Sequence, residues 1–326
     1  MTELTVLKEF GAALDGDSRG PSPQLRARLV GQFSVAPAAR RRVRRVALAA
    51  GLAALATVAL LASSTLWLWG AAPAASAEAA ALLRHAATAA SRGPDLAPAP
   101  DQFVYVKSVE TAAVLTGNSH GGITSTRMQT DLREIWQSAD GSRTGVLKEL
   151  PQPAAGQWQI TALAGCRNGK TIPAAGVADW GGSCLPQPGY HAGLPTTASA
   201  MLGYLYRNSH GQNPPDVEAF ITAGDLIRES YVQPAALAAV FGAAALIPGV
   251  TVVLDVRNAA GQLGIGVQQT FRGISEQLIF SPRTYAFIGE RQVAVSAGAG
   301  LPVGSVLDST AILATGIVDH AGLLPR

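Results

Sequence analysis

The serine at position 119 stands in the string that most resembles a catalytic motif. Gly117-Asn118-Ser119-His120-Gly121 matches G-x-S-x-G, the nucleophile elbow, whose serine occupies a sharp turn from a buried strand into a helix. Residues 122–126 are polar or β-branched and begin a helix poorly. Residues 208–211 repeat four of these letters in another predicted loop. The pattern therefore favours a loop between two strands, with a serine hydrolase that uses Ser119 as the alternative.

The other titratable side chains lack the spacing of a metal or phosphate site. The five histidines show neither H-x-x-x-H nor H-E-x-x-H, and the chain contains no P-loop and no G-x-G-x-x-G. Four acidic residues recur at irregular helical spacing, which is typical of a solvated helix face: Asp216, Glu218, Asp225 and Glu229. We therefore predict no catalytic, cofactor-binding or metal-binding residue, and no cofactor.

Two cysteines form the clearest chemical pair. Cys166 and Cys184 both lie in glycine-rich stretches that predict a loop. An even cysteine count outside the cytoplasm favours a disulfide. The bridge closes a loop of about 19 residues and contributes about 3 kcal/mol in the chain-entropy model.

Three tryptophans could line an apolar ligand groove beneath a curved sheet. They are Trp136, Trp158 and Trp180. Tryptophan is more often part of a hydrophobic core, so the groove is an alternative to ordinary core packing.

The basic charge of the chain belongs to its N-terminal part. Residues 1–45 contain nine Lys and Arg against four Asp and Glu, whereas the remainder contains 16 against 18. A nucleic-acid-binding domain needs basic residues spread over a folded face. We therefore expect no nucleic-acid partner.

Residues 46–70 are uncharged and dominated by Ala, Leu and Val. About 20 such residues suffice to cross a bilayer as a helix. Five arginines precede the segment, which keeps that end in the cytosol by the positive-inside rule: Arg40, Arg41, Arg42, Arg44 and Arg45. Trp67 and Trp69 stand at the far end, where indoles prefer the membrane interface. The sequence thus predicts a single transmembrane helix with the C-terminal part outside.

Two alternatives to this anchor stay open. A buried core helix would also be apolar, although an abutting arginine cluster is unusual for one. A cleaved signal peptide is the other, because Ala75-Ser76-Ala77 is an A-x-A site, although signal peptides usually have a shorter apolar stretch. The basic tail itself either fixes the topology only, or docks on a partner or the inner leaflet through short apolar repeats.

The part beyond the apolar segment alternates between strand and helix patterns. A helix at 78–87 and an Ala/Pro-rich linker lead to strands at 102–109, 131–138 and 144–149. Helices follow at 198–207, 217–231 and 235–247, and then strands at 250–256, 263–271, 277–280, 284–288, 292–295 and 309–318. Strands, helices and strands in this order are typical of an α+β domain with a curved antiparallel sheet and an inserted helical block.

Several segments carry a resemblance to a known family. They are the arginine run at 40–45, Gln102-Phe103-Val104-Tyr105, Arg133-Glu134-Ile135-Trp136 with Asp140-Gly141, residues 245–250, Ala260-Gly261 and residues 278–282. The chain resembles uncharacterised actinobacterial single-pass membrane proteins, several of which accompany extracytoplasmic-function sigma factors. The resemblance implies an anchored exterior domain and no established activity.

Together these observations predict four segments and a binding function. The segments are a cytosolic tail at 1–45, a transmembrane helix at 46–70, a helix and linker at 71–101, and an extracytoplasmic α+β domain at 102–326. The predicted partners are the lipid bilayer and either an apolar ligand or an envelope protein, in a non-enzymatic role linked to envelope sensing. The alternatives are the tethered serine hydrolase and a regulator that acts on a sigma factor through its tail.

Overall fold

The computed structural model describes residues 73–117, 123–152, 156–172, 182–296 and 302–325. Some predicted features lie outside these residues. They are the tail at 1–45 with its arginines, the segment at 46–70 with Trp67 and Trp69, Ser119 and Trp180.

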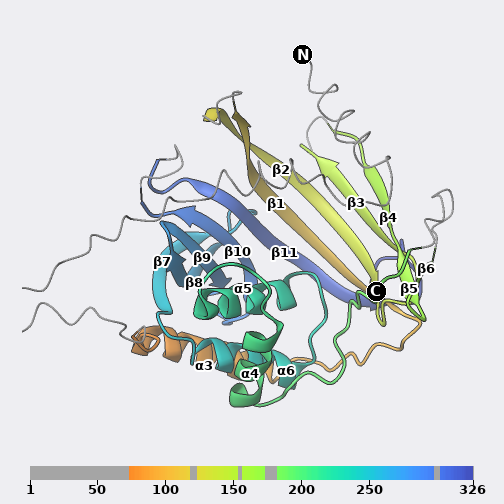
Figure 1. The fold of residues 1–326 in the computed structure, drawn as a ribbon, viewed down its shortest axis with the longest axis horizontal. Coiled ribbons are helices and arrows are strands. Elements are labelled where there is room, and N and C mark those ends of the chain that lie inside the picture. Colours follow the sequence, from red (N-terminus) through yellow and green to blue (C-terminus); the bar gives the residue numbers. More distant parts are fainter. Residues whose placement is uncertain (1–72, 118–122, 153–155, 173–181, 297–301, 326) are drawn as a thin grey trace, which may run out of the picture. The chain divides into compact units, whose positions relative to one another are not determined.

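Nine strands of the described residues form one antiparallel sheet in the order β4-β3-β2-β1-β11-β10-β9-β8-β7. Consecutive strands pair within β1–β4 and within β7–β11, so the sheet consists of two meanders that join where β1 lies beside β11 (Figure 1). The strands are β1 (Phe103–Gly117), β2 (Ile123–Ser138), β3 (Gly145–Pro151), β4 (Gln159–Leu163), β7 (Thr251–Arg257), β8 (Leu263–Phe271), β9 (Ile274–Phe280), β10 (Phe287–Ala294) and β11 (Val306–Val318).

Four helices lie on one side of this sheet, toward β7–β10, and α4 packs on α5 and α6 (Figure 1). They are α3 (Ala77–Ala90), α4 (Ala198–Asn208), α5 (Pro215–Arg228) and α6 (Pro234–Ala244). The Ser76 hydroxyl caps α3 by accepting from the Ala79 amide, and Thr197 caps α4 in the same way. Proline opens α5 and α6, because its missing N–H costs nothing in the first turn.

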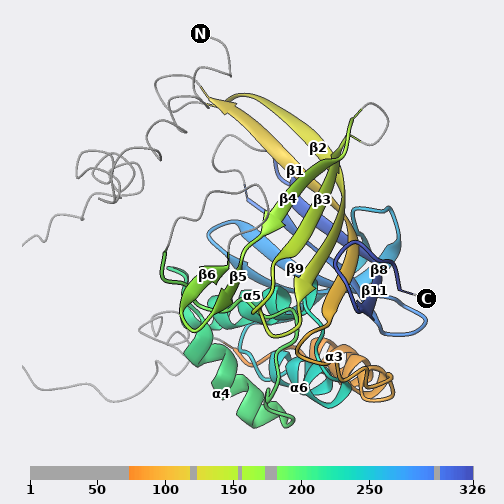
Figure 2. The ribbon, with the colours of Figure 1, turned by 90° about the vertical axis from the view of Figure 1, so that its right-hand side faces the viewer.

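The hydrophobic core lies mainly between the helices and the sheet. Its largest fully buried side chains include Phe220 of α5, Phe241 of α6 and Phe280 of β9. A second cluster on the same face contains Val104 and Val106 of β1. The far end of the β1–β2 hairpin lies away from the helices (Figure 2).

The opposite face of β1 carries a separate core. Phe103 and Tyr105 alternate with the valines of the same strand, so they pack on this second face with Trp136 of β2. The Trp136 indole donates to the Leu323 carbonyl, which holds the C-terminal segment over the cluster. Residues 103–106 of β1 are all buried, so this end of the strand is covered on both faces of the sheet.

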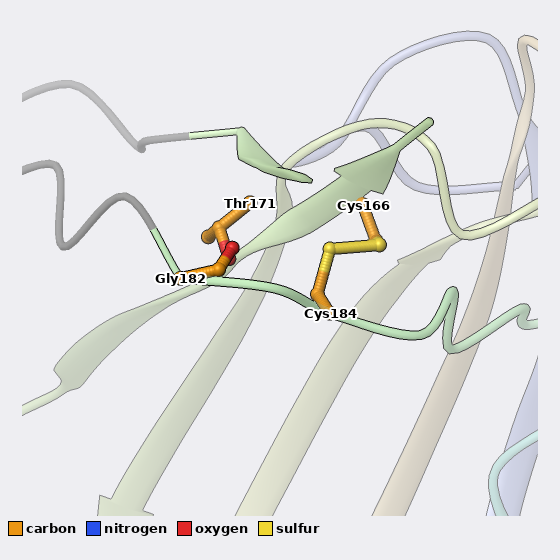
Figure 3. Close-up of a disulfide and its surroundings, with 4 residues drawn as sticks. All are labelled: Cys166, Thr171, Gly182 and Cys184. Carbon is orange, nitrogen blue, oxygen red and sulfur yellow. A yellow bond between two sulfur atoms is a disulfide. The ribbon is translucent and has the colours of Figure 1, made fainter. Parts of the chain in front are cut away.

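A small disulfide-linked hairpin stands apart from the large sheet. It consists of β5 (Gly165–Arg167) and β6 (Lys170–Ile172). Cys166 of β5 is bonded to Cys184, as the sequence predicted, and the Thr171 amide and hydroxyl both donate to the Gly182 carbonyl beside the bridge (Figure 3). The bridge therefore ties residues 182–184 to the hairpin.

The predicted fold class needs correction. It placed a transmembrane helix before an α+β domain with an inserted helical block, whereas the described residues form mostly one large nine-stranded sheet with four helices. Helix α3 precedes the sheet, where the helix at 78–87 was predicted, and α4, α5 and α6 lie between β6 and β7 in the chain. None of the described helices combines the length and apolar character needed to span a membrane. Local patterns could not show that two meanders join into one sheet, because the β1–β11 pairing connects residues some two hundred positions apart in the sequence.

Candidate functional site

An apolar cavity lies where the helices meet the middle of the sheet. Its volume is about 430 Å³, within the range of roughly 300–1,000 Å³ found for ligand pockets. Leu237 and Phe241 of α6 line it, together with Phe287 of β10 and Ile312 of β11. Three alanines of α3 also line the cavity, and their small side chains leave it unfilled: Ala86, Ala89 and Ala90. The cavity can therefore accept a compact apolar group.

The local sequence explains why these residues face one another. Leu237 and Phe241 are four positions apart on α6 and therefore lie on the same side of the helix. Ala86 and Ala90 have the same spacing on α3, which packs against α6. Alanine at these positions keeps the helical backbone but fills little volume, so the two helices and the sheet do not close the space between them.

Tyr231 fixes the segment that follows α5 beside the cavity. Its hydroxyl accepts a hydrogen bond from the Leu96 amide at 2.7 Å and donates to the Pro94 carbonyl at 3.2 Å. Its own amide donates to the Gly189 carbonyl at 2.8 Å. Burial raises the pKa of Tyr231, so the hydroxyl stays protonated and keeps both roles. The linker before β1 is thus held against the cavity wall.

A ring pair closes another side of the cavity. The His85 ring of α3 stacks on Tyr285 with ring centres 4.9 Å apart and 22° between the planes. Tyr285 lies in the turn between β9 and β10, where its amide donates to the Ser281 carbonyl. Tyr285 has φ +57, a left-handed backbone conformation that side chains rarely adopt. The stack therefore connects the turn to α3 across the edge of the cavity.

A layer of ion pairs joins α5 and the residue after it to the sheet. The Arg228 guanidinium donates to Glu290 of β10 at 2.7 Å. The Arg133 guanidinium of β2 pairs with Glu110 of β1 at 2.9 Å, with Glu149 of β3 at 3.1 Å and with Glu229. Arg133 therefore connects three strands with the end of α5.

Carboxylates of this layer have raised pKa values. Burial raises the pKa of Glu276 to about 7, and burial also raises the pKa of Glu290 although Arg228 opposes the shift. Burial has the same effect on Asp308 of β11. Ile227 and Ser230, which flank Arg228 and Glu229 in the sequence, line the apolar cavity, so the charged layer and the cavity meet at the end of α5.

Core packing, the favoured interpretation of the tryptophans, is confirmed for Trp136, and the alternative of a tryptophan-lined groove is wrong for the residues that the structure describes. Trp136 is buried in the cluster on the sheet face opposite the helices. Trp158 precedes the edge strand β4 and is 43% exposed. Tyrosine, phenylalanine and aliphatic side chains line the observed cavity instead.

The predicted solvated acidic face is wrong for Glu218, Asp216 and Glu229, whereas Asp225 is exposed as predicted. Glu218 is buried and accepts from the Asn213 amide at 2.8 Å. Asp216 accepts from the Tyr206 hydroxyl at 2.6 Å, and Glu229 pairs with Arg133. Within the described ranges no group of three His, Cys, Asp or Glu is arranged to hold a metal ion.

The sequence contained weak signals for the cavity. Ala86 lies on the apolar face of the helix predicted at 78–87, and Ala89 and Ala90 follow it at helical spacing, where larger side chains would be expected to fill a core. Nothing in the local pattern showed that residues 284–287 and 312–315 would meet this helix. The site was therefore missed because its walls come from four distant segments.

Comparison with known proteins finds only distant structural similarity. No protein-family model and no curated protein matches the chain. Similar solved structures include the Pseudomonas aeruginosa MucA/MucB complex, at 13% identity and TM-score 0.28, covering 77% of this chain and 59% of that one. MucB alone has 14% identity and TM-score 0.26, covering 77% and 61%. MucB with MucA(peri) has 12% identity and TM-score 0.23, covering 72% and 54%. The chain spans about three fifths of these proteins or less, and such low scores carry no argument about function.

Proposed function

We propose that this chain is an extracytoplasmic, non-enzymatic binding protein, attached to the membrane through its N-terminal part. It binds an apolar group of a ligand or envelope partner in the cavity between α3, α6 and β11. The observation that carries the proposal is the open, mainly apolar cavity of about 430 Å³ at the helix–sheet seam. Binding sites are commonly concave and lined by apolar and aromatic side chains with few polar groups.

The compartment is supported by chemistry away from the cavity. Cys166 and Cys184 form a disulfide, and such bonds persist mainly in oxidising environments outside the cytoplasm. The arginine run at 40–45 and the uncharged segment at 46–70 fit membrane attachment with the C-terminal part outside.

The proposal favours binding over catalysis because of the chemistry of the lining. The polar side chains at the cavity are few, chiefly Ser230, Tyr231, Thr284 and Thr315. The Tyr231 hydroxyl already bonds to the backbone of residues 94 and 96. Burying apolar surface supplies the binding energy, at about 25 cal/mol per Å².

Photo-crosslinking tests the proposed site. The full-length chain in lipid nanodiscs is irradiated with a palmitic acid analogue that carries a diazirine, and labelled peptides are mapped by mass spectrometry. We expect labelling of the segments that line the cavity, including the peptide with Leu237 and Phe241. Ala90→Trp fills the cavity and should lower this labelling at least about 10-fold, an order of magnitude that corresponds to about 1.4 kcal/mol.

A matched control substitutes an exposed residue on the far edge of the sheet. Leu254 of β7 is 66% exposed and does not line the cavity, so Leu254→Trp should label like the unchanged chain. Equal labelling of Ala90→Trp and the unchanged chain, or labelling spread evenly over the surface, would contradict the proposed site.

A further inference from the structure

Strand β11 is paired on both sides for only part of its length. Its ladder with β1 runs to Val318, opposite Phe103. Its ladder with β10 ends at Ala311, opposite Gly289, because β10 begins at Phe287 after the turn that leaves β9 (Figure 1). Within the described residues, 312–318 therefore have a strand on one side only.

Open space follows this free edge. The apolar cavity reaches it at Ile312 and Thr315. A second cavity of about 640 Å³ is lined by residues 315–319, by Leu96 and by the C-terminal residues 323–325. Thr315 lines both cavities. Together they leave room beside β11 from the β9–β10 turn to the C-terminal segment.

The edge itself has the chemistry of a strand that accepts a partner. Every second residue of an antiparallel strand directs its N–H and C=O away from the paired neighbour. Residues 312–318 read Ile-Leu-Ala-Thr-Gly-Ile-Val, with no charge and no proline. Native sheets usually protect exposed edges with charges, prolines or bulges. Leu313 is 42% exposed, and Ala314 and Thr315 are exposed too, so the edge is accessible at residues 313–315, whereas Gly316 and Val318 are buried.

The outer edge of the sheet at β7 differs. Its register with β8 shifts between Val253 and Val256, and Asp255 in this interval has φ +54. A bulge with a charged residue twists an edge and blocks further pairing. Strand β11 also has a register shift, which leaves Leu313 between the partners of Ser108 and Lys107. Unlike the bulge of β7, this one carries no charged residue, so β7 is the better protected of the two edges.

We propose that the occupant of the apolar cavity is an extended peptide segment of a partner protein. The segment adds to β11 at residues 312–315 as a further antiparallel strand, in the position that β10 leaves empty. Its main chain bonds to the free edge, and alternate side chains enter the apolar cavity, as in other cases of strand addition. This inference rests on the proposed function and names its partner class.

The shape of the space favours a peptide over the other occupants. A fatty acyl chain would fill the cavity but would leave the N–H and C=O groups of the edge without partners, which is costly once they lose water. Residues 284–287 stand at one end of the free edge and residues 323–325 at the other. One extended chain fits between them more readily than the sheet edge of a second copy. The uncharged edge and lining select apolar residues at alternate positions.

A peptide probe tests the inference. Phe-Val-Tyr-Val-Lys-Ser-Val, the sequence of residues 103–109, already pairs antiparallel with this part of β11 on its other side. The fluorescein-labelled peptide is titrated into the full-length chain in nanodiscs and followed by anisotropy. Two further peptides carry N-methyl groups at odd or at even positions. One of these two peptides should bind at least about 10-fold more weakly than the unmethylated peptide. Its methyl groups remove the main-chain hydrogen bonds to β11, while its side chains are unchanged.

Two variants complete the experiment. Thr315→Trp fills the edge space and should weaken peptide binding at least about 10-fold, whereas Leu254→Trp on the protected edge should not. A displayed library of random seven-residue peptides is also panned against the same chain, so that the test does not depend on the sequence of a single probe peptide. Enriched peptides should alternate apolar residues and lose binding to Thr315→Trp.

The outcomes separate the inference from the proposed function. If neither the probe nor any enriched peptide depends on Thr315 or on main-chain N–H groups, the peptide inference is overturned. If the diazirine fatty acid still labels the cavity in that case, the proposed binding function stands with a small apolar ligand. If neither probe labels or binds the cavity, both are wrong.

Discussion

At the scale of single residues, Arg133 shows how one side chain can hold several elements together. Its guanidinium pairs with Glu110 of β1, Glu149 of β3 and Glu229 after α5, and its side chain is only 16% exposed. Removing one partner of a largely buried ion network leaves uncompensated charge. Because the three carboxylates are each about one-third exposed, water screens part of this cost.

Replacing this arginine should destabilise the fold. We expect Arg133→Met to lower the free energy of unfolding by about 2 kcal/mol, measured by urea denaturation followed by circular dichroism. The control is Arg143→Met, because Arg143 pairs with Asp101 at 3.8 Å where both side chains are well exposed. That change should cost less than about 0.5 kcal/mol. Equal losses of unfolding free energy in the two variants would show that the Arg133 network stabilises the fold no more than an exposed ion pair does.

At the scale of elements, the carboxylates beneath α5 make its docking depend on pH. Burial raises the pKa of Glu276 from 4.5 to about 7, with Glu290, Asp225 and Asp308 adding like charge. A carboxyl with a raised pKa binds its proton more tightly in the folded than in the unfolded chain. Its contribution to stability is therefore fully present below pH 4.5 and is lost as the pH rises through about 7.

This direction of the pH dependence can be measured. The free energy of unfolding should fall between pH 4.5 and about 7, measured by denaturant titration at each pH. Glu276→Gln removes the titrating group and should flatten this part of the curve. A curve of unchanged slope in Glu276→Gln would contradict the role of Glu276, because the remaining carboxylates would then account for the whole dependence.

Individual elements were largely predictable from local patterns. Strand β8 begins and ends where the alternation of residues 263–271 predicted, and α3 lies over the predicted helix at 78–87. Strand β10 was predicted as two strands, because Gly289 and two charged residues interrupt its apolar pattern. Strand β4 was missed since its first four residues are exposed and carry no alternation of burial. Periodicity detects a strand only where one face is buried.

At the scale of the whole described domain, the sequence could not predict the site. The cavity forms because β1 meets β11, α3 packs on α6, and the β9–β10 turn reaches His85. Each of these contacts joins residues far apart in the chain, and none leaves a mark in local composition. The disulfide was predictable because it depends on two cysteines and a compartment, not on the register of a sheet.

One labelling experiment tests most directly whether an accessible binding site lies outside the cytoplasm. Cys166 and Cys184 are joined, so Thr315→Cys introduces a single reactive thiol at the exposed free edge of β11. Intact cells that express this full-length variant are treated with a small membrane-impermeant maleimide. We expect labelling of Thr315→Cys without lysis, slowed by the bound peptide probe, whereas Leu254→Cys should be labelled at the same rate with or without the probe. Labelling of Thr315→Cys only after lysis would place residue 315 in the cytosol and overturn the proposed function.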